Sequence, residues 1–261
     1  MRLVTFDRRG HRRLGALLQG KVVDLPELVG HPAFPDTMER LVRRNGGTVL
    51  DAARAALERD EADVMACVVD EARLLASVVP STLRSSDAAE SHRPVFGPDD
   101  EIPWPEGAGW LEFHPKIAAV LRRPVDDALR PENVPDAIFG YTLVADWFAL
   151  SASGDPIATP AGVPVSIGPS VVTADEIDPQ TTFVTIRVDG TEWLKGNLNG
   201  TARSLLREVA AASRQERLSP GDAFASAPFE IPGFEHRIWQ GAEVEVEGEG
   251  IGVLRNRLGR R

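Results

Sequence analysis

The second half of the chain is a series of short runs in which apolar and polar residues alternate, and this pattern constrains the fold more than any other. Alternation with a period of two is typical of β-strands that have one buried face. Glycine and proline residues separate the runs, as they do in turns between strands. The runs predict strands at 116–121, 141–147, 170–173, 182–188, 223–226, 242–247 and 252–256, and one helix at 201–215. We therefore expect an α+β fold that is mostly β, with its strands rolled into one core.

The first 79 residues predict a small α+β domain. Short apolar runs predict strands at 2–6, 14–18 and 21–25, and two further segments, 37–43 and 49–57, predict helices. Residues 80–109 contain five prolines and are typical of a long loop, and long loops inside compact domains are often lids. The sequence thus predicts a domain at 1–79 and a β-roll domain at 80–261, which opens with a lid-like loop at 80–109.

Composition argues against several classes of function. A formal net charge of −10 and a pI near 5.1 disfavour nucleic acid as a partner, because phosphates require clustered Lys and Arg. No apolar run approaches the ~20 residues of a membrane span, and no secretory signal is visible, so we expect a cytoplasmic protein. Neither a Gly-x-Gly-x-x-Gly motif nor a phosphate loop occurs, so no nucleotide or organic cofactor is expected. A small molecule is the expected partner.

Six fragments of the sequence lie in an order and at a spacing that point to one family. They span 110–121, 140–146, 167–177, 188–190, 218–222 and 250–256, and the third reads Ile-Gly-Pro-Ser-Val-Val-Thr-Ala-Asp-Glu-Ile. Together they resemble the fumarylacetoacetate hydrolase (FAH) superfamily over nearly the whole chain. The resemblance implies a small N-terminal domain, then that superfamily's mixed β-roll, in a protein that forms a homodimer.

The resemblance also implies where a metal site would lie. Family members hold a divalent cation with a Glu-x-Glu pair and two aspartates. The pair falls on His114 and Lys116, the first aspartate falls on Ser85, and the second is retained as Asp146. A protonated lysine cannot ligate a hard cation and repels it, so we expect no bound metal. The family's proton-transfer histidine is retained as His92.

The substrate-binding positions of the family have changed as well. Its arginine falls on Leu150, and its lysine falls near Thr159. Side chains alternate along a strand, so Glu112 and His114 would lie on the same face as Lys116. Trp147, next to Asp146, is either a core residue or a wall of the pocket. The candidate substrate-binding residues are therefore Glu112, His114, Trp147, Leu150 and Thr159.

Three functions remain open on this reasoning. In the first, Lys116 replaces the metal, pairs with Asp146 and stabilises an enolate oxygen, while His92 moves the proton. This describes a metal-independent enzyme that decarboxylates, isomerises or cyclises an enolisable β-dicarbonyl-type small molecule. In the second, the site has migrated, and Glu112, His114 and Asp146 bind the metal of an acylpyruvate-type C–C bond hydrolase. In the third, the Lys116–Asp146 pair is only structural, in a non-catalytic binding or structural subunit.

Overall fold

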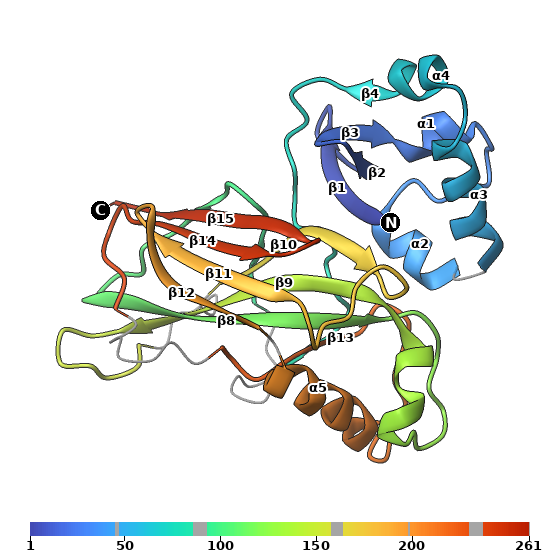
Figure 1. Ribbon diagram of the computed structural model, residues 1–261. Coiled ribbons are helices and arrows are strands. Elements are labelled where there is room, and N and C mark those ends of the chain that lie inside the picture. Colours follow the sequence, from blue (N-terminus) through green and yellow to red (C-terminus); the bar gives the residue numbers. More distant parts are fainter. Residues whose placement is uncertain (45–46, 86–92, 158–163, 198, 230–236, 261) are drawn as a thin grey trace.

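The computed structural model describes residues 1–44, 47–85, 93–157, 164–197, 199–229 and 237–260 (Figure 1). The fold is α+β and mostly β, as the sequence predicts. The N-terminal residues form a lobe at one side of a larger body of layered strands (Figure 1). No helix within the described ranges is long and apolar enough to cross a bilayer.

The N-terminal lobe is a short antiparallel sheet with helices packed beside it. Asp24 begins the first helix as its N-cap, because its Oδ1 accepts a hydrogen bond of 3.0 Å from the backbone N–H of Glu27. Gly30 ends that helix with a φ of 70°, a conformation that glycine adopts without strain. The elements of the lobe are β1 (Arg2–Arg8), β2 (His11–Leu18), β3 (Lys21–Asp24), α1 (Leu25–Val29), α2 (Met38–Arg44), α3 (Gly47–Leu57), α4 (Glu61–Ala66) and β4 (Val68–Val69).

The rest of the chain forms the layered body. Two long strands, β8 and β9, run through its centre, and one long helix, α5, packs below them in the view of Figure 1. The elements are β5 (Leu83–Ser85), β6 (Val95–Phe96), β7 (Glu101–Ile102), β8 (Trp110–Leu121), two 3-10 turns (Pro131–Asn133 and Pro135–Ala137), β9 (Ile138–Leu150), β10 (Val165–Thr173), β11 (Phe183–Val188), β12 (Thr191–Asn197), α5 (Asn199–Ala212), β13 (Ala223–Ala225), β14 (Glu243–Gly248) and β15 (Gly252–Leu258).

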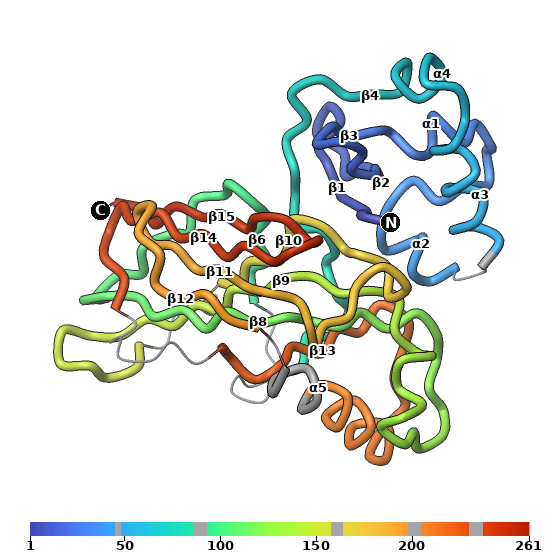
Figure 2. Tube along the Cα trace, in the orientation of Figure 1, coloured from blue at the N-terminus to red at the C-terminus, as the bar shows by residue number. Residues whose placement is uncertain are grey.

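The strands form two sheets. The larger has the order β4-β3-β2-β1-β10-β9-β8-β13-β5. One further strand of this sheet, β6, pairs with β10 and lies beside it in Figure 2. The strands of the lobe join this sheet through β1, in which Arg2 lies opposite Val172 and Leu3 opposite Val171 of β10. The smaller sheet has the order β12-β11-β14-β15-β7. The lobe and the body therefore share one sheet.

The central strands separate two hydrophobic cores. On one face of β8, Leu111, Phe113 and Ile117 pack in a core that also contains residues of the smaller sheet and of α5. On the other face, Ala118 and Val120 pack in a core shared with the N-terminal lobe. Both faces of these strands are buried, and this explains their nearly continuous apolar sequence. A charged side chain on either face must therefore find its partners inside the protein.

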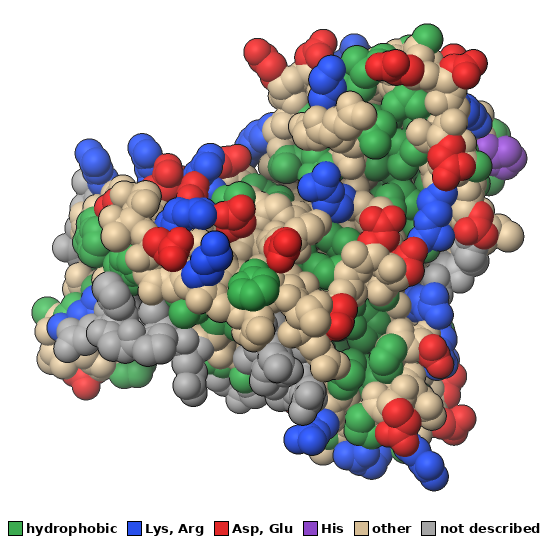
Figure 3. All heavy atoms as spheres, viewed as in Figure 1, with side chains coloured by type: hydrophobic (Ala, Val, Ile, Leu, Met, Phe, Trp, Pro, Cys, Tyr) green, Lys and Arg blue, Asp and Glu red, His purple; other side chains and the backbone are tan. Residues whose placement is uncertain are grey.

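The outer face of the smaller sheet is charged and solvated. Glutamates of β14 pair with arginines of the two flanking strands: Arg187 lies 2.7 Å from Glu247, and Arg255 lies 2.7 Å from Glu245. Acidic and basic side chains interleave over this sheet on the face shown in Figure 3. Exposed pairs of this kind contribute about 0–1 kcal/mol each, so they add little to the stability of the sheet.

Residues 80–109 differ in part from the sequence prediction. The described part of this segment is mostly loop, as expected, but it also contributes three short strands to the two sheets, which the sequence did not predict. β5 pairs with β13, β6 pairs with β10 and β7 pairs with β15, all in parallel. Residues 86–92 of this segment lie outside the described ranges.

Candidate functional site

The register of β8 and β9 assembles a polar face at the centre of the large sheet. His114 lies directly opposite Asp146, Glu112 lies opposite Phe148, and β8 continues unbroken through a proline at position 115. Because side chains alternate along a strand, Glu112, His114 and Lys116 project from the same face as Asp146 and Phe148. We call this face of β8 and β9 the site face. It is the face that turns toward the core shared with the N-terminal lobe.

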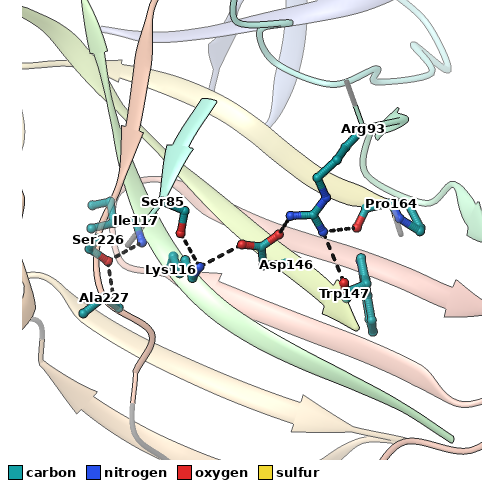
Figure 4. Close-up of polar contacts among 9 residues, drawn as sticks. All are labelled: Ser85, Arg93, Lys116, Ile117, Asp146, Trp147, Pro164, Ser226 and Ala227. Atoms are coloured by element: carbon teal, nitrogen blue, oxygen red, sulfur yellow. Dashed lines mark hydrogen bonds and ion pairs between the residues drawn. The ribbon is translucent and has the colours of Figure 1, made fainter. Parts of the chain in front are cut away.

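Lys116 and Asp146 form a buried ion pair on the site face. The Lys116 Nζ donates a hydrogen bond to Asp146 Oδ2 at 2.8 Å and another to Ser85 Oγ at 2.5 Å (Figure 4). The two charged side chains are 0% and 1% exposed. A pair taken out of water persists only where its geometry is good and further hydrogen bonds offset the desolvation. The predicted contact between Lys116 and Asp146 is thus present, and Ser85 supplies an additional acceptor.

Arg93 is a second cation at the same carboxylate, and the sequence analysis did not find it. Its Nη1 donates to Asp146 Oδ1, and its Nη2 donates to the backbone carbonyls of Trp147 at 3.2 Å and Pro164 at 2.9 Å (Figure 4). The side chain is 12% exposed. The only feature of the sequence that could have pointed to Arg93 is its position directly after His92, a predicted site residue. The two oxygens of Asp146 are therefore bound by different cations.

Aromatic rings line the site face next to this cluster. The rings of His114 and Phe148 lie 4.5 Å apart between centroids, and the Arg93 guanidinium carbon lies 5.9 Å from the Phe148 ring centroid. The Phe148 ring thus contacts both the His114 ring and the Arg93 guanidinium, whose positive charge is attracted by the ring quadrupole. Glu112, His114 and Phe148 are each half-buried. This partly exposed strip leads to the buried Lys116–Asp146 pair.

The other predicted site residues lie elsewhere or outside the described ranges. Trp147 projects from the opposite face of β9, where its ring lies 5.5 Å from that of Phe113 and its Nε1 donates to Ser166 Oγ at 3.0 Å. It is a core aromatic, so the expectation that its side chain walls the pocket is wrong. Leu150 ends β9 opposite Trp110, further along the sheet. His92 and Thr159 lie outside the described residues.

The donor groups of this site do not fit a divalent cation. Both oxygens of Asp146 already meet cationic groups, and the Lys116 ammonium lies between Asp146 and Ser85. Across the described ranges, no group of three or more His, Cys, Asp and Glu side chains is arranged to hold a metal ion. The described side chains of Glu112, His114 and Asp146 are therefore not gathered into one set of metal ligands, as the migrated site would require. The arrangement instead offers nitrogen donors, which bind oxyanions.

Comparisons with known proteins found proteins that are similar to this chain in sequence or in fold. The mitochondrial oxaloacetate tautomerase of Xenopus laevis is 24% identical over 253 residues, which cover 86% of this chain and 78% of that protein. The solved fumarylacetoacetate hydrolase of Exiguobacterium antarcticum is 22% identical, with a TM-score of 0.76 and 100% of both chains covered. The maleylpyruvate hydrolase of Sphingobium sp. SYK-6, solved with manganese(II) and pyruvate, is 22% identical, with a TM-score of 0.75 and 99% of both chains covered. At these identities the two solved structures support the fold alone.

A family match settles the relationship. The sequence profile described as "Fumarylacetoacetate (FAA) hydrolase C-terminal" matches residues 69–259. That range covers well over half of the chain, and it includes β8, β9 and the whole of the site face. The chain therefore belongs to the fumarylacetoacetate hydrolase family.

Proposed function

We propose that this protein is an enzyme that acts on an enolisable β-dicarbonyl-type small molecule, and that Lys116 stabilises the enolate oxygen without a divalent metal. One observation carries the proposal. The Lys116 Nζ lies between Asp146 Oδ2 at 2.8 Å and Ser85 Oγ at 2.5 Å. By the family resemblance, all three of these positions belong to metal ligands. The Lys116 ammonium thus lies among positions that would surround a divalent cation in other members of the family.

Lys116 would act on the enolate by electrostatic attraction. An ammonium fixed in a buried site stabilises charge that develops on a nearby oxygen, and it needs little reorganisation during the reaction. The effective dielectric there is lower than in water, which strengthens the interaction. An enolate oxygen can replace the Ser85 hydroxyl at Lys116, because that acceptor is neutral and its loss leaves the charged pair with Asp146 intact. The hydroxyl then marks where the reacting oxygen binds.

Isomerisation by proton transfer is the reaction class that we favour. The Xenopus laevis relative is named as an oxaloacetate tautomerase, and one solved neighbour was crystallised with pyruvate. In such a reaction a base removes a proton from the carbon between two carbonyl groups and returns it at another atom, so no water is consumed. His92 is the proton-transfer residue that the sequence suggests. His114, directly opposite Asp146, is the described imidazole on the site face. Decarboxylation and cyclisation would proceed through the same enolate.

The test uses oxaloacetate as the probe. The enol form is mixed with the protein in a chelator such as EDTA, and the loss of enol absorbance is followed. We expect catalysis to persist in the chelator and to fall about 100-fold or more in Lys116→Met, as when one oxyanion donor is removed. Lys195→Met, on an exposed edge strand, is the matched control. Catalysis that EDTA abolishes and manganese restores would contradict the metal-independent mechanism.

A structural role is the second candidate, and the complete burial of the pair favours it. Lys116 is 0% exposed, and a lysine is rarely buried so completely unless its charge is paired. On this reading the wild-type protein neither turns over oxaloacetate nor binds oxalate, a planar mimic of the pyruvate enolate. Binding of oxalate by the metal-free wild type, weakened about 10-fold or more in Lys116→Met, would exclude the purely structural role.

A further inference from the structure

We infer that Arg93 is a positioning residue, which fixes the orientation of the Asp146 carboxylate and, through it, that of the Lys116 ammonium. The expected effect of Arg93 substitutions on turnover rests on the proposed function. The expected effect on the orientation of Asp146 and Lys116 does not. The inference assigns a role to a residue that neither the sequence motifs nor the family resemblance singles out.

The backbone around Arg93 is anchored to the sheet. The residue lies two positions before Val95, which pairs in parallel with Val165 of β10. The carbonyl of Pro94 accepts a hydrogen bond of 3.0 Å from the Val165 N–H. Because Val165 lies opposite Asp146 of β9, these contacts hold the backbone next to Arg93 beside the part of β9 that carries the carboxylate.

The guanidinium is anchored as well. Its Nη2 donates to the carbonyls of Trp147 and Pro164, at 3.2 and 2.9 Å. These two carbonyl-bearing residues are themselves joined, because the Trp147 N–H donates to the Pro164 carbonyl at 3.3 Å. A guanidinium is planar and rigid, so fixing Nη2 also fixes the direction of Nη1. That direction leads to Asp146 Oδ1.

The consequence appears at the carboxylate. The terminal torsion of an aspartate is broad, so a carboxylate that is held at one oxygen only can rotate. Arg93 holds Oδ1, and this leaves Oδ2 facing the Lys116 Nζ at 2.8 Å. A lysine at position 93 would keep the charge but would lose the planar fork that sets the angle. Arg93→Lys therefore separates charge from orientation.

Lysine NMR tests the inference without a substrate. The chain has three lysines, Lys21, Lys116 and Lys195, and only Lys116 is buried. With ¹⁵Nζ-labelled lysine, the hydrogen-bonded ammonium of Lys116 should give a slowly exchanging signal that Lys116→Met removes. We expect Arg93→Lys and Arg93→Met to broaden or shift this signal while the protein stays folded. A purely structural tie between β6 and β9 would leave the signal unchanged.

Arg84→Lys is the matched control. Arg84 is 14% exposed, pairs with Glu216 at 2.9 Å and lies over the Phe224 ring, but it does not contact Asp146 in the described structure. We expect this variant to keep the Lys116 signal of the wild type. An unchanged signal in both Arg93 variants, or an equal change in Arg84→Lys, would overturn the inference.

Turnover of oxaloacetate gives a second reading. We expect Arg93→Lys to lower kcat about 10-fold or more with little change in KM, because orientation is lost and charge is kept. If the wild type does not turn over oxaloacetate, the proposed function fails, and the NMR result still decides the positioning role. A wild-type kcat in Arg93→Lys, with an active wild type, would contradict the inference directly.

Discussion

Asp146 is held by two cations, one at each carboxylate oxygen, and this arrangement decides what loss of either cation costs. Arg93 takes Oδ1 and Lys116 takes Oδ2. A buried carboxylate that loses its only partner costs about 3–5 kcal/mol. Here one cation remains after a single substitution, so Asp146 is not left alone. The two cations should therefore show strong energetic coupling.

We predict that Lys116→Met lowers the free energy of unfolding by only about 1–2 kcal/mol, because Arg93 still pairs with Asp146 and the methionine retains most of the packing of the lysine stem. The double variant Arg93→Met/Lys116→Met should cost about 3–5 kcal/mol or more, above the sum of the two single variants. Urea unfolding of all four proteins measures the coupling. Additive costs would show that Arg93 does not share the carboxylate.

The buried phenol of Tyr141 should make the stability of the protein depend on pH in the alkaline range. Burial, with a smaller contribution from Asp178, raises its pKa to about 12. The neutral phenol is therefore favoured in the folded protein, and its contribution to stability is complete below about pH 10. That contribution is lost as the pH rises from about 10 to about 12, and it amounts to about 3 kcal/mol at most.

Because Tyr141 is the only tyrosine, the absorbance of tyrosinate reports on it alone. The folded protein should titrate near pH 12, and the denatured protein near pH 10. Tyr141→Phe should remove this part of the alkaline destabilisation. A midpoint near pH 10 in the folded protein would show that the side chain is accessible to water.

Between elements, the close approach of β9 and β10 depends on a glycine. A Cβ at Gly140 would lie 2.2 Å from the Val172 carbonyl oxygen, which is backbone and cannot move aside. We predict that Gly140→Ala lowers the free energy of unfolding by about 1–3 kcal/mol through overpacking. Gly196→Ala in β12 is the control, since nothing lies within 4 Å of its added Cβ. Equal stability of Gly140→Ala and the wild type in urea unfolding would contradict this account.

The sequence located most of the strands, including the short β3 and β13, but it missed β5, β6, β7 and β12. The core strands around 116–121 and 141–147 were located from the sequence, although β8 begins at Trp110 and β9 at Ile138. The short strands β5, β6 and β7 have two or three residues each, too few to show a period. β12 was missed because a register irregularity in its pairing, between Ile186 and Arg187 of β11, interrupts the alternation.

At the scale of the whole molecule, the site face lies where the lobe meets the body. The Ser77 hydroxyl, from the end of the lobe, hydrogen-bonds with that of Thr142 in β9 at 3.0 Å. Sequence predicted the Lys116–Asp146 contact, because period and resemblance place both residues on neighbouring strands. It did not predict Arg93, which lies 53 residues from Asp146 and reaches it through the pairing of β6 with β10. Such a contact depends on topology that a short strand does not reveal.

Manganese binding tests our proposal that the Lys116 ammonium stands at the position where members of the family hold a divalent cation. Manganese binding is measured by titration calorimetry for the dialysed wild type and for Ser85→Asp/Lys116→Glu, which restores carboxylates at two positions that the resemblance assigns to metal ligands. Lys195→Glu is the control for added negative charge. We predict binding of about one equivalent by the double variant and none of comparable affinity by the wild type or the control. One tightly bound equivalent in the wild type, lost in Asp146→Asn, would contradict the account.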